Sequence, residues 1–192
     1  MFATMPSVAL DPAYRRVGIH EFLSLDLGDA KAELVDGVIF MVACGGESHA
    51  RIAANLIIAL GTRLRGSGCR PYGSDFAMRT DEHTIRFPDV SVYCRPADPA
   101  NDRRQLLGDP QVVFEVLSPS TASNDQRVKL PEYQALTGLR EIVLVDPESE
   151  RVHLYHRTAR GGWTGEWLNV GEDVPLPSLD VVIPYTEIFA RD

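Results

Sequence analysis

The sequence predicts an α/β or α+β fold in which a mixed β-sheet is flanked by helices and extended by extra β-hairpins. Helical and strand-like patterns alternate along the chain, which is typical of layered helix–sheet architectures. Two nearly continuous apolar segments, residues 111–117 and 141–145, have the length and composition of strands buried on both faces. The length of 192 residues fits one domain, so we expect a loose N-terminal arm at 1–17 and a single domain over 18–192.

Charge and cysteine usage restrict the class of protein. The chain carries 19 Lys and Arg against 27 Asp and Glu, and the net charge of −8 disfavours binding of nucleic acid through a general basic patch. There is no apolar run of about 18 residues and no secretory signal pattern, so we expect a cytoplasmic protein without a membrane span. Cys44, Cys69 and Cys94 are widely spaced and odd in number, which predicts reduced thiols rather than a disulfide framework.

The first half of the chain contains one strong hairpin signal and one long amphipathic helix. Asp36-Gly37 lies between alternating apolar residues, so residues 33–42 are expected to form two short strands. Apolar residues at helical spacing follow, with Ser48 as the expected N-cap and Arg65 near the end of the helix. Further elements are predicted at 19–25 (helix) and at 70–79 and 85–93 (strands).

The second half alternates in the same way. After the buried strand at 111–117, residues 123–126 have capping-box spacing, and Pro131 predicts a bend or the start of a second helix. The segment 151–156 alternates and is expected to pair with the strand at 141–145. Closing elements are predicted at 163–169, 179–183 and 188–189.

Two carboxylates lie in apolar strand segments, where a charge is costly unless it is paired or bound to metal. Asp89 follows Pro88 in IRFPDVSVY, and Glu115 lies in VVFEVL, 26 residues later. One such residue is usually a salt-bridge partner. Two on strands that can be neighbours, with Lys129 in the following helix, form a more specific pattern. Phosphate-binding loops, dinucleotide-binding glycine motifs and zinc-protease motifs do not occur in the sequence.

These residues resemble the Uma2 family, also called DUF820, within the PD-(D/E)xK nuclease superfamily. The resemblance covers about residues 33–155 and implies a restriction-endonuclease-like fold. It is carried by ELVDG at 33–37, His49, RFPDV at 86–90, VFEVLSPST at 114–121, Asp125, Lys129, Tyr133 and EIVLVDP at 141–147.

The resemblance implies a magnesium or manganese site. Asp89 and Glu115 would be the metal-binding pair, and the carbonyl oxygen of Val116 a third ligand, because Mg²⁺ favours oxygen donors. The family pattern places a lysine two residues after the second acid, but this chain has Leu117 there. The resemblance implies that Lys129, on the next helix, supplies the cation instead; the alternative is a surface ion pair with Asp125, four residues earlier.

Two further residues are assigned to the candidate catalytic set. Glu33 is expected either to face the metal site or to be an exposed carboxylate at a strand edge. His49 is expected either to reach a phosphate or act as a general base, or to be an ordinary polar residue of the first helical turn. The scattered arginines are expected either to line a groove or, as is usual for such residues, to be solvated surface: Arg70, Arg79, Arg86, Arg103, Arg104 and Arg127.

The functional prediction is a metal-dependent endonuclease that hydrolyses DNA, with DNA expected in preference to RNA. One alternative is a catalytically silent binding or assembly module with a nuclease fold, motivated by Leu117 and the net charge of −8. Another is the same metal chemistry on RNA or a smaller phosphodiester. A homodimer is expected because two-fold pairs are the commonest oligomers.

Overall fold

The structure is a computed structural model that describes residues 15–28, 30–42, 45–95, 106–118 and 125–191. Its largest element is a six-stranded sheet with the order β11-β10-β9-β8-β6-β3. β8 and β9 are parallel and the other neighbouring pairs are antiparallel, so the sheet is mixed, as predicted. Its strands are β3 (Cys69–Gly73), β6 (Val90–Cys94), β8 (Val112–Val116), β9 (Glu141–Asp146), β10 (Arg151–Arg157) and β11 (Trp163–Leu168).

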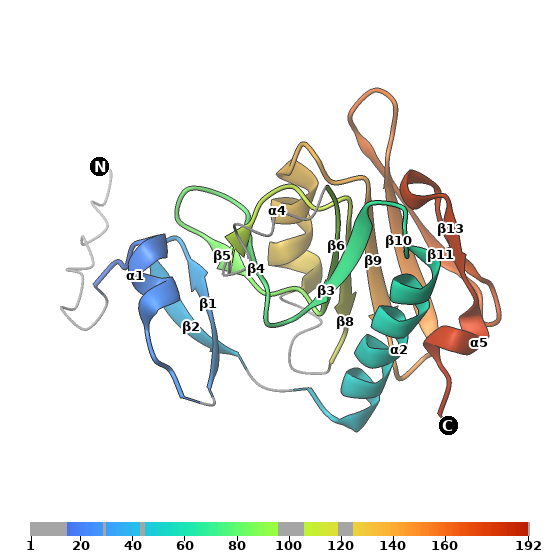
Figure 1. Ribbon diagram of the computed structural model, residues 1–192, viewed down its shortest axis with the longest axis horizontal. Coiled ribbons are helices and arrows are strands. Elements are labelled where there is room, and N and C mark those ends of the chain that lie inside the picture. Colours follow the sequence, from blue (N-terminus) through green and yellow to red (C-terminus); the bar gives the residue numbers. More distant parts are fainter. Residues whose placement is uncertain (1–14, 29, 43–44, 96–105, 119–124, 192) are drawn as a thin grey trace, which may run out of the picture.

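Helices cover the two faces of this sheet (Figure 1). On one face α2 (Glu47–Arg63) buries Ile52, Leu56 and Leu60 against side chains of β6 and β8. On the other, the π-helical turn η3 (Asp125–Lys129) leads into α4 (Leu130–Ala135), which buries Tyr133. No helix in the described part of the chain is long and apolar enough to cross a lipid bilayer.

A second, smaller sheet with the order β2-β1-β5-β4-β7 lies beside the first, and α1 (Ile19–Ser24) packs against it (Figure 1). Asp36 and Gly37 have positive φ values of 49° and 77°, so the predicted hairpin between β1 and β2 is confirmed. Leu34 of β1 and Ile85 of β5 are fully buried in the local core. The strands are β1 (Lys31–Val35), β2 (Val38–Val42), β4 (Ala77–Arg79), β5 (Ile85–Arg86) and β7 (Leu106–Leu107).

The C-terminal segment closes the core beside α2. β12 (Val174–Leu176) and β13 (Val181–Ile183) form a separate hairpin, joined by the short 3₁₀ helix η4 (Pro177–Leu179). The closing element expected at 188–189 begins earlier and is helical: Ile188 is the last residue of the helix α5 (Tyr185–Ile188). α5 contacts α2 and buries Ile188 in the same core.

The segment 85–93, predicted as one strand, forms two strands that belong to different sheets. β5 ends at Arg86 in the small sheet, and β6 begins at Val90 in the large one. Pro88 lies between them, and because proline has no backbone N–H it cannot continue a ladder. Asp89 is therefore placed where the chain crosses from one sheet to the other.

Three other boundaries differ from the prediction or sharpen it. The N-cap of α2 is Gly46 rather than Ser48, which lies within the helix. The single strand expected at 70–79 is divided into β3 and β4. A new helix does begin beside Pro131, as predicted, whereas the capping residues Ser123 and Asn124 lie outside the described residues.

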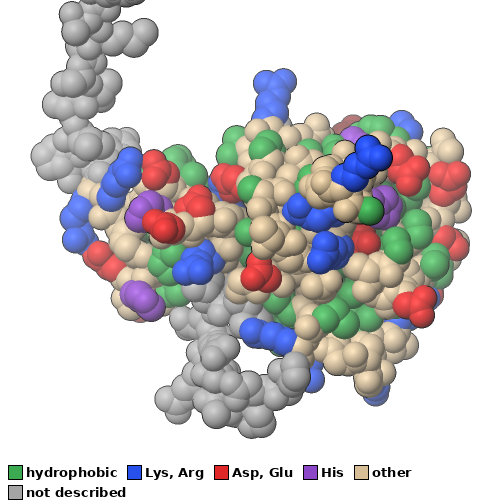
Figure 2. Space-filling model, turned by 90° about the horizontal axis from the view of Figure 1, so that it is seen from above, with side chains coloured by type: hydrophobic (Ala, Val, Ile, Leu, Met, Phe, Trp, Pro, Cys, Tyr) green, Lys and Arg blue, Asp and Glu red, His purple; other side chains and the backbone are tan. Residues whose placement is uncertain are grey.

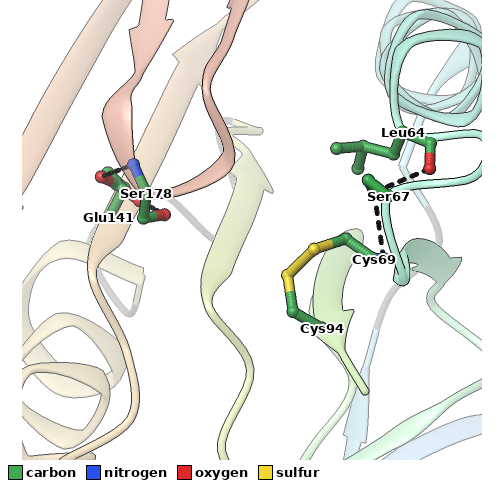
Figure 3. The surroundings of a disulfide bond; sticks show 6 residues. All are labelled: Leu64, Ser67, Cys69, Cys94, Glu141 and Ser178. Carbon is green, nitrogen blue, oxygen red and sulfur yellow. Dashed lines mark hydrogen bonds between the residues drawn. A yellow bond between two sulfur atoms is a disulfide. The ribbon is translucent and has the colours of Figure 1, made fainter. Parts of the chain in front are cut away.

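The prediction of three reduced thiols is wrong for two of them. Cys69 and Cys94 form a disulfide bond (Figure 3). They are 25 residues apart, but the antiparallel register of β3 and β6 places them directly opposite each other. Sequence spacing alone does not reveal this pairing, because it depends on how the two strands are aligned. Cys44 lies outside the described residues.

Breaking this disulfide is expected to destabilise the protein. Cys94→Ser should lower the free energy of unfolding by about 2–4 kcal/mol, because the unfolded chain regains the freedom of a closed loop. Urea denaturation with and without a reductant measures the effect: the reductant should lower the stability of the wild type and leave Cys94→Ser unchanged. Equal sensitivity of both proteins to the reductant contradicts the bond.

Candidate active site

Asp89 and Glu115 are brought together by strand register. β6 and β8 are antiparallel neighbours with Val90 opposite Phe114, so the next position along places Asp89 opposite Glu115. The backbone N–H of Val116 donates a hydrogen bond to Oδ2 of Asp89 at 2.7 Å, which fixes this carboxylate at the end of the strand pair. Both acids line one cavity of about 800 Å³.

The other sequence-predicted site residues line the same cavity. Glu33 comes from β1, His49 from the first turn of α2 and Lys129 from the end of η3, and Val116 contributes from β8. The cavity thus lies where the small sheet, the large sheet and the helices α1, α2 and η3 meet. All of the residues proposed from the sequence are brought into one place.

Lys129 is at the centre of the acidic side chains. Its Nζ lies 3.1 Å from Oε1 of Glu115, 3.2 Å from Oδ1 of Asp125 and 3.3 Å from Oε1 of Glu33. The lysine side chain is only 8% exposed, so this is a buried ion cluster and not the alternative of a surface pair. Leu117, at the position where the family pattern has lysine, packs instead into the core beneath α4.

Burial and charge act in opposite directions on the pKa values of this cluster. Burial raises the pKa of Glu115 to about 8; Lys129 opposes the rise, while Asp89 and Asp125 add to it. Desolvation lowers the pKa of Lys129, but attraction to Glu115, Glu33 and Asp125 together raises it above the usual value. Lys129 is therefore held in its charged form, and Glu115 is poised to gain or lose a proton near neutral pH.

Tyr133 provides a second donor to Glu115. Its hydroxyl donates to Oε1 of Glu115 at 2.5 Å from the first turns of α4. The tyrosine is fully buried, and this burial raises the pKa of its hydroxyl well above the usual value, so it remains a donor. One carboxylate oxygen of Glu115 thus has both Lys129 and Tyr133 as partners.

His49 forms a pair with Asp89. Its Nε2 lies 3.1 Å from Oδ2 of Asp89, and this hydrogen bond raises the pKa of the imidazole despite partial burial. The ring packs against Gly45, where a Cβ atom would lie only 2.4 Å from the ring carbon Cγ. Gly45 therefore leaves room for the histidine, which explains the glycine between the first hairpin and α2.

Arg86 was misinterpreted as solvated surface and is among the most buried side chains. It is 2% exposed, and its guanidinium donates to both oxygens of Glu132 at 2.8 and 2.6 Å and to Oε2 of Glu33 at 2.8 Å. These bonds raise its pKa further, although desolvation opposes them. One feature of the sequence could have predicted this burial. Arg86 lies in a strand-like segment three residues before Asp89, where a solvated side chain is not expected.

The cluster carries an excess of negative charge. Lys129 and Arg86 are its two permanent cations, and they face five carboxylates, those of Glu33, Asp89, Glu115, Asp125 and Glu132. Within the described residues no group of three or more His, Cys, Asp or Glu side chains is arranged to hold a metal. Mg²⁺ does not need such a group, because it binds through one or two carboxylates and keeps several waters. Asp89, Glu115 and the Val116 carbonyl fit that donor chemistry.

The raised pKa of Glu115 predicts a pH-dependent stability. Between about pH 4.5 and 8 the folded state keeps a proton that the unfolded state loses, so the free energy of unfolding falls as pH rises, by at most ~1.4 kcal/mol per pH unit. Glu115→Gln should remove this slope, whereas Glu148→Gln, at an exposed turn, should keep it. Urea denaturation across this range measures the slopes, and parallel curves for wild type and Glu115→Gln contradict the assignment.

Comparisons with known proteins identify the family of this chain. The family model Uma2, described as "Putative restriction endonuclease", matches residues 19–184. The chain is 34% identical over 136 residues to "Uncharacterized protein slr1290" of Synechocystis sp., covering 69% of this chain and 70% of that protein. It is 27% identical over 134 residues to sll1609 of the same organism, covering 69% and 76%.

A solved structure has the same fold. The crystal structure of "a putative nuclease belonging to DUF820" from Anabaena variabilis matches with a TM-score of 0.74 and 18% sequence identity. The match covers 91% of this chain and 98% of that one. The restriction-endonuclease-like mixed sheet expected from the sequence is therefore a fold already seen in a crystal.

Proposed function

The chain belongs to the Uma2 family, and we propose on that basis that it is a metal-dependent endonuclease that hydrolyses phosphodiester bonds in DNA. The observation that carries the proposal is the position of Asp89, one residue before β6, opposite Glu115 of the neighbouring strand β8, in the same cavity as Lys129. Two carboxylates and a lysine at one point are the groups that phosphodiester hydrolysis needs, for metal binding and for charge stabilisation.

Asp89, Glu115 and the carbonyl oxygen of Val116 would hold Mg²⁺ or Mn²⁺. When bound, such an ion polarises a phosphoryl oxygen and lowers the pKa of water. The Val116 N–H holds the Asp89 carboxylate in place, and the hydroxyl of Tyr133 does the same for Glu115. These bonds hold the two acids in position before substrate arrives.

Lys129 and His49 would act on the substrate from either side of the acidic pair. The Lys129 ammonium, kept charged by its three carboxylate partners, stabilises negative charge that develops on the phosphate. The raised pKa of His49 favours its protonated form, which suits it to contact a phosphate oxygen rather than to serve as a general base. Glu33 orients Lys129 through their ion pair.

The proposal is tested by cleavage and by metal binding. The wild type should cleave DNA with Mg²⁺ or Mn²⁺ and not with EDTA. Calorimetric titration with Mn²⁺ near pH 7 should release a proton, because a bound cation drives Glu115 into its charged form. The measured heat should therefore depend on the ionisation enthalpy of the buffer. Inactivity on all DNA substrates in both metals contradicts the proposal.

A specific observation favours the catalytically silent module as second candidate. Lys129 and Tyr133 already satisfy one oxygen of Glu115, so this acid has partners without a metal. If this candidate is correct, Mn²⁺ titration gives no binding heat and Glu115→Gln is at least as stable as the wild type at pH 8.

A further inference from the structure

We propose that the cavity beside the carboxylates receives one unpaired nucleotide, so that the substrate is single-stranded DNA or an unpaired end rather than an intact duplex. This inference rests on the proposed function and specifies its substrate. It follows from the shape and chemistry of the cavity, which extends well beyond the residues that would carry out the hydrolysis.

The cavity has two chemically different parts. One part holds the acidic cluster and His49. The other part is largely apolar and comes from α1 and the loop after it, from α2 and from the crossing segment before β6, with Asp26, Lys31, Ser74 and Asp75 as its polar lining residues. The cavity volume of about 800 Å³ falls in the range of ~300–1,000 Å³ that is typical of small-ligand pockets. A nucleobase presents a flat π-face that packs against such side chains. The apolar wall includes Phe22, Leu23, Leu25, Leu27, Ile57 and Phe87.

Small residues keep the cavity open. Ala50, Ala53 and Ala54 recur at helical spacing on the side of α2 that lines the cavity. Gly73 at the end of β3 also lines it, and a Cβ atom there would meet Cδ1 of Ile57 at 3.3 Å. Larger side chains at these positions would fill the space that the base occupies.

Lys31 supplies a cation near the mouth. Lys31 and Lys129 are the only Lys or Arg residues among the described residues that line the cavity. Lys129 is engaged by three buried carboxylates. The side chain of Lys31 is 48% exposed, and its Nζ donates to the Ser74 hydroxyl at 2.7 Å and lies 3.9 Å from Oδ1 of the fully exposed Asp75. Lys31 also lies close enough to His49 to lower its pKa slightly. It is thus placed to bind a phosphate adjacent to the scissile one.

The surface charge disfavours an intact duplex. Non-specific duplex binding depends on several phosphate contacts made by Lys and Arg. Acidic and basic side chains are interspersed over the face seen in Figure 2, and the chain has a net charge of −8. Affinity must then come from the cavity itself, and a base enters a pocket only after it leaves the stack, which is least costly in an unpaired strand.

The test uses a variant that fills the cavity without altering the acidic cluster. Ala54 is exposed and lines the cavity, so Ala54→Trp should fold and obstruct the base; Ile58→Trp, one turn further along α2 and outside the lining, is the matched control. Fluorescence anisotropy with labelled oligothymidylate and with a duplex of equal length, in Ca²⁺, measures binding. Lys31→Met and Ala50→Leu provide independent variants should Ala54→Trp fail to fold by circular dichroism.

Wild type and Ile58→Trp should bind oligothymidylate at least about tenfold more tightly than duplex, and Ala54→Trp should lose about tenfold in affinity. Lys31→Met should bind more weakly and with a shallower salt dependence. Equal binding of duplex and single strand, with Ala54→Trp and Ala50→Leu unaffected, overturns the inference.

Cleavage separates this inference from the proposed function. If the wild type cleaves duplex DNA in a metal-dependent reaction and Ala54→Trp cleaves it equally well, the inference alone is overturned. The expected binding pattern without cleavage of any DNA in Mn²⁺ overturns the nuclease proposal and leaves the cavity as a binding site for unpaired nucleotides.

Discussion

Asp89→Asn is expected to reduce metal-dependent DNA cleavage by about 100-fold or more while leaving the protein folded. Asparagine has nearly the same shape as aspartate, and its amide oxygen can still accept the hydrogen bond that Val116 N–H donates. It lacks the negative charge that a divalent cation and the His49 imidazolium require. The loss should therefore appear in the rate of cleavage and in Mn²⁺ affinity, with little change in unfolding temperature.

Asp146→Asn is the matched control for this substitution. Asp146 also accepts a backbone N–H, that of Glu148 at 2.9 Å, but it closes the turn after β9 and does not line the cavity. Cleavage by this variant should equal that of the wild type. If Asp89→Asn cleaves as well as Asp146→Asn, Asp89 is not part of the active site.

Lys129→Met should be the most destabilising single substitution in the cluster. It leaves the carboxylates of Glu33, Glu115 and Asp125 buried without their shared cation. Removing one partner of a buried ion pair costs about 3–5 kcal/mol, because the remaining charge is neither solvated nor paired. Urea denaturation at pH 7 measures the loss.

Arg63→Met tests whether any ion pair would give the same result. Arg63 donates to both carboxylate oxygens of Glu187 at 2.7 Å, but this pair is exposed to solvent. Exposed pairs contribute little, so this variant should be much closer to the wild type than Lys129→Met. Equal losses for the two variants would show that burial of the cluster has no energetic effect.

The central residues of the site could be predicted from the sequence, because the sequence shows carboxylates in apolar segments, where their burial is energetically unfavourable. Carboxylates in apolar strands are expensive, so Asp89 and Glu115 had to have partners. The four-residue spacing of Asp125 and Lys129 likewise predicted a common helical face, and their side chains are in contact at 3.2 Å. Each of these inferences used a local pattern together with one energetic requirement.

The missed features depend on contacts between distant segments. Arg86 pairs with Glu132, 46 residues later, and nothing near either residue in the sequence identifies the other. The disulfide depends on the alignment of β3 with β6. Pro88 indicated that the strand expected at 85–93 could be interrupted. The sequence did not show that its two halves belong to separate sheets.

The crossing of the chain between the two sheets has a mechanical consequence. Glu33 and Arg86 belong to the small sheet, whereas their partners Lys129 and Glu132 belong to the helical segment that covers the large one. The charged side chains proposed to act in hydrolysis therefore also hold the small sheet against the helical segment that covers the large sheet. A fluctuation that separates the sheets must break these ion pairs, so the small sheet cannot detach while the buried ion cluster stays assembled.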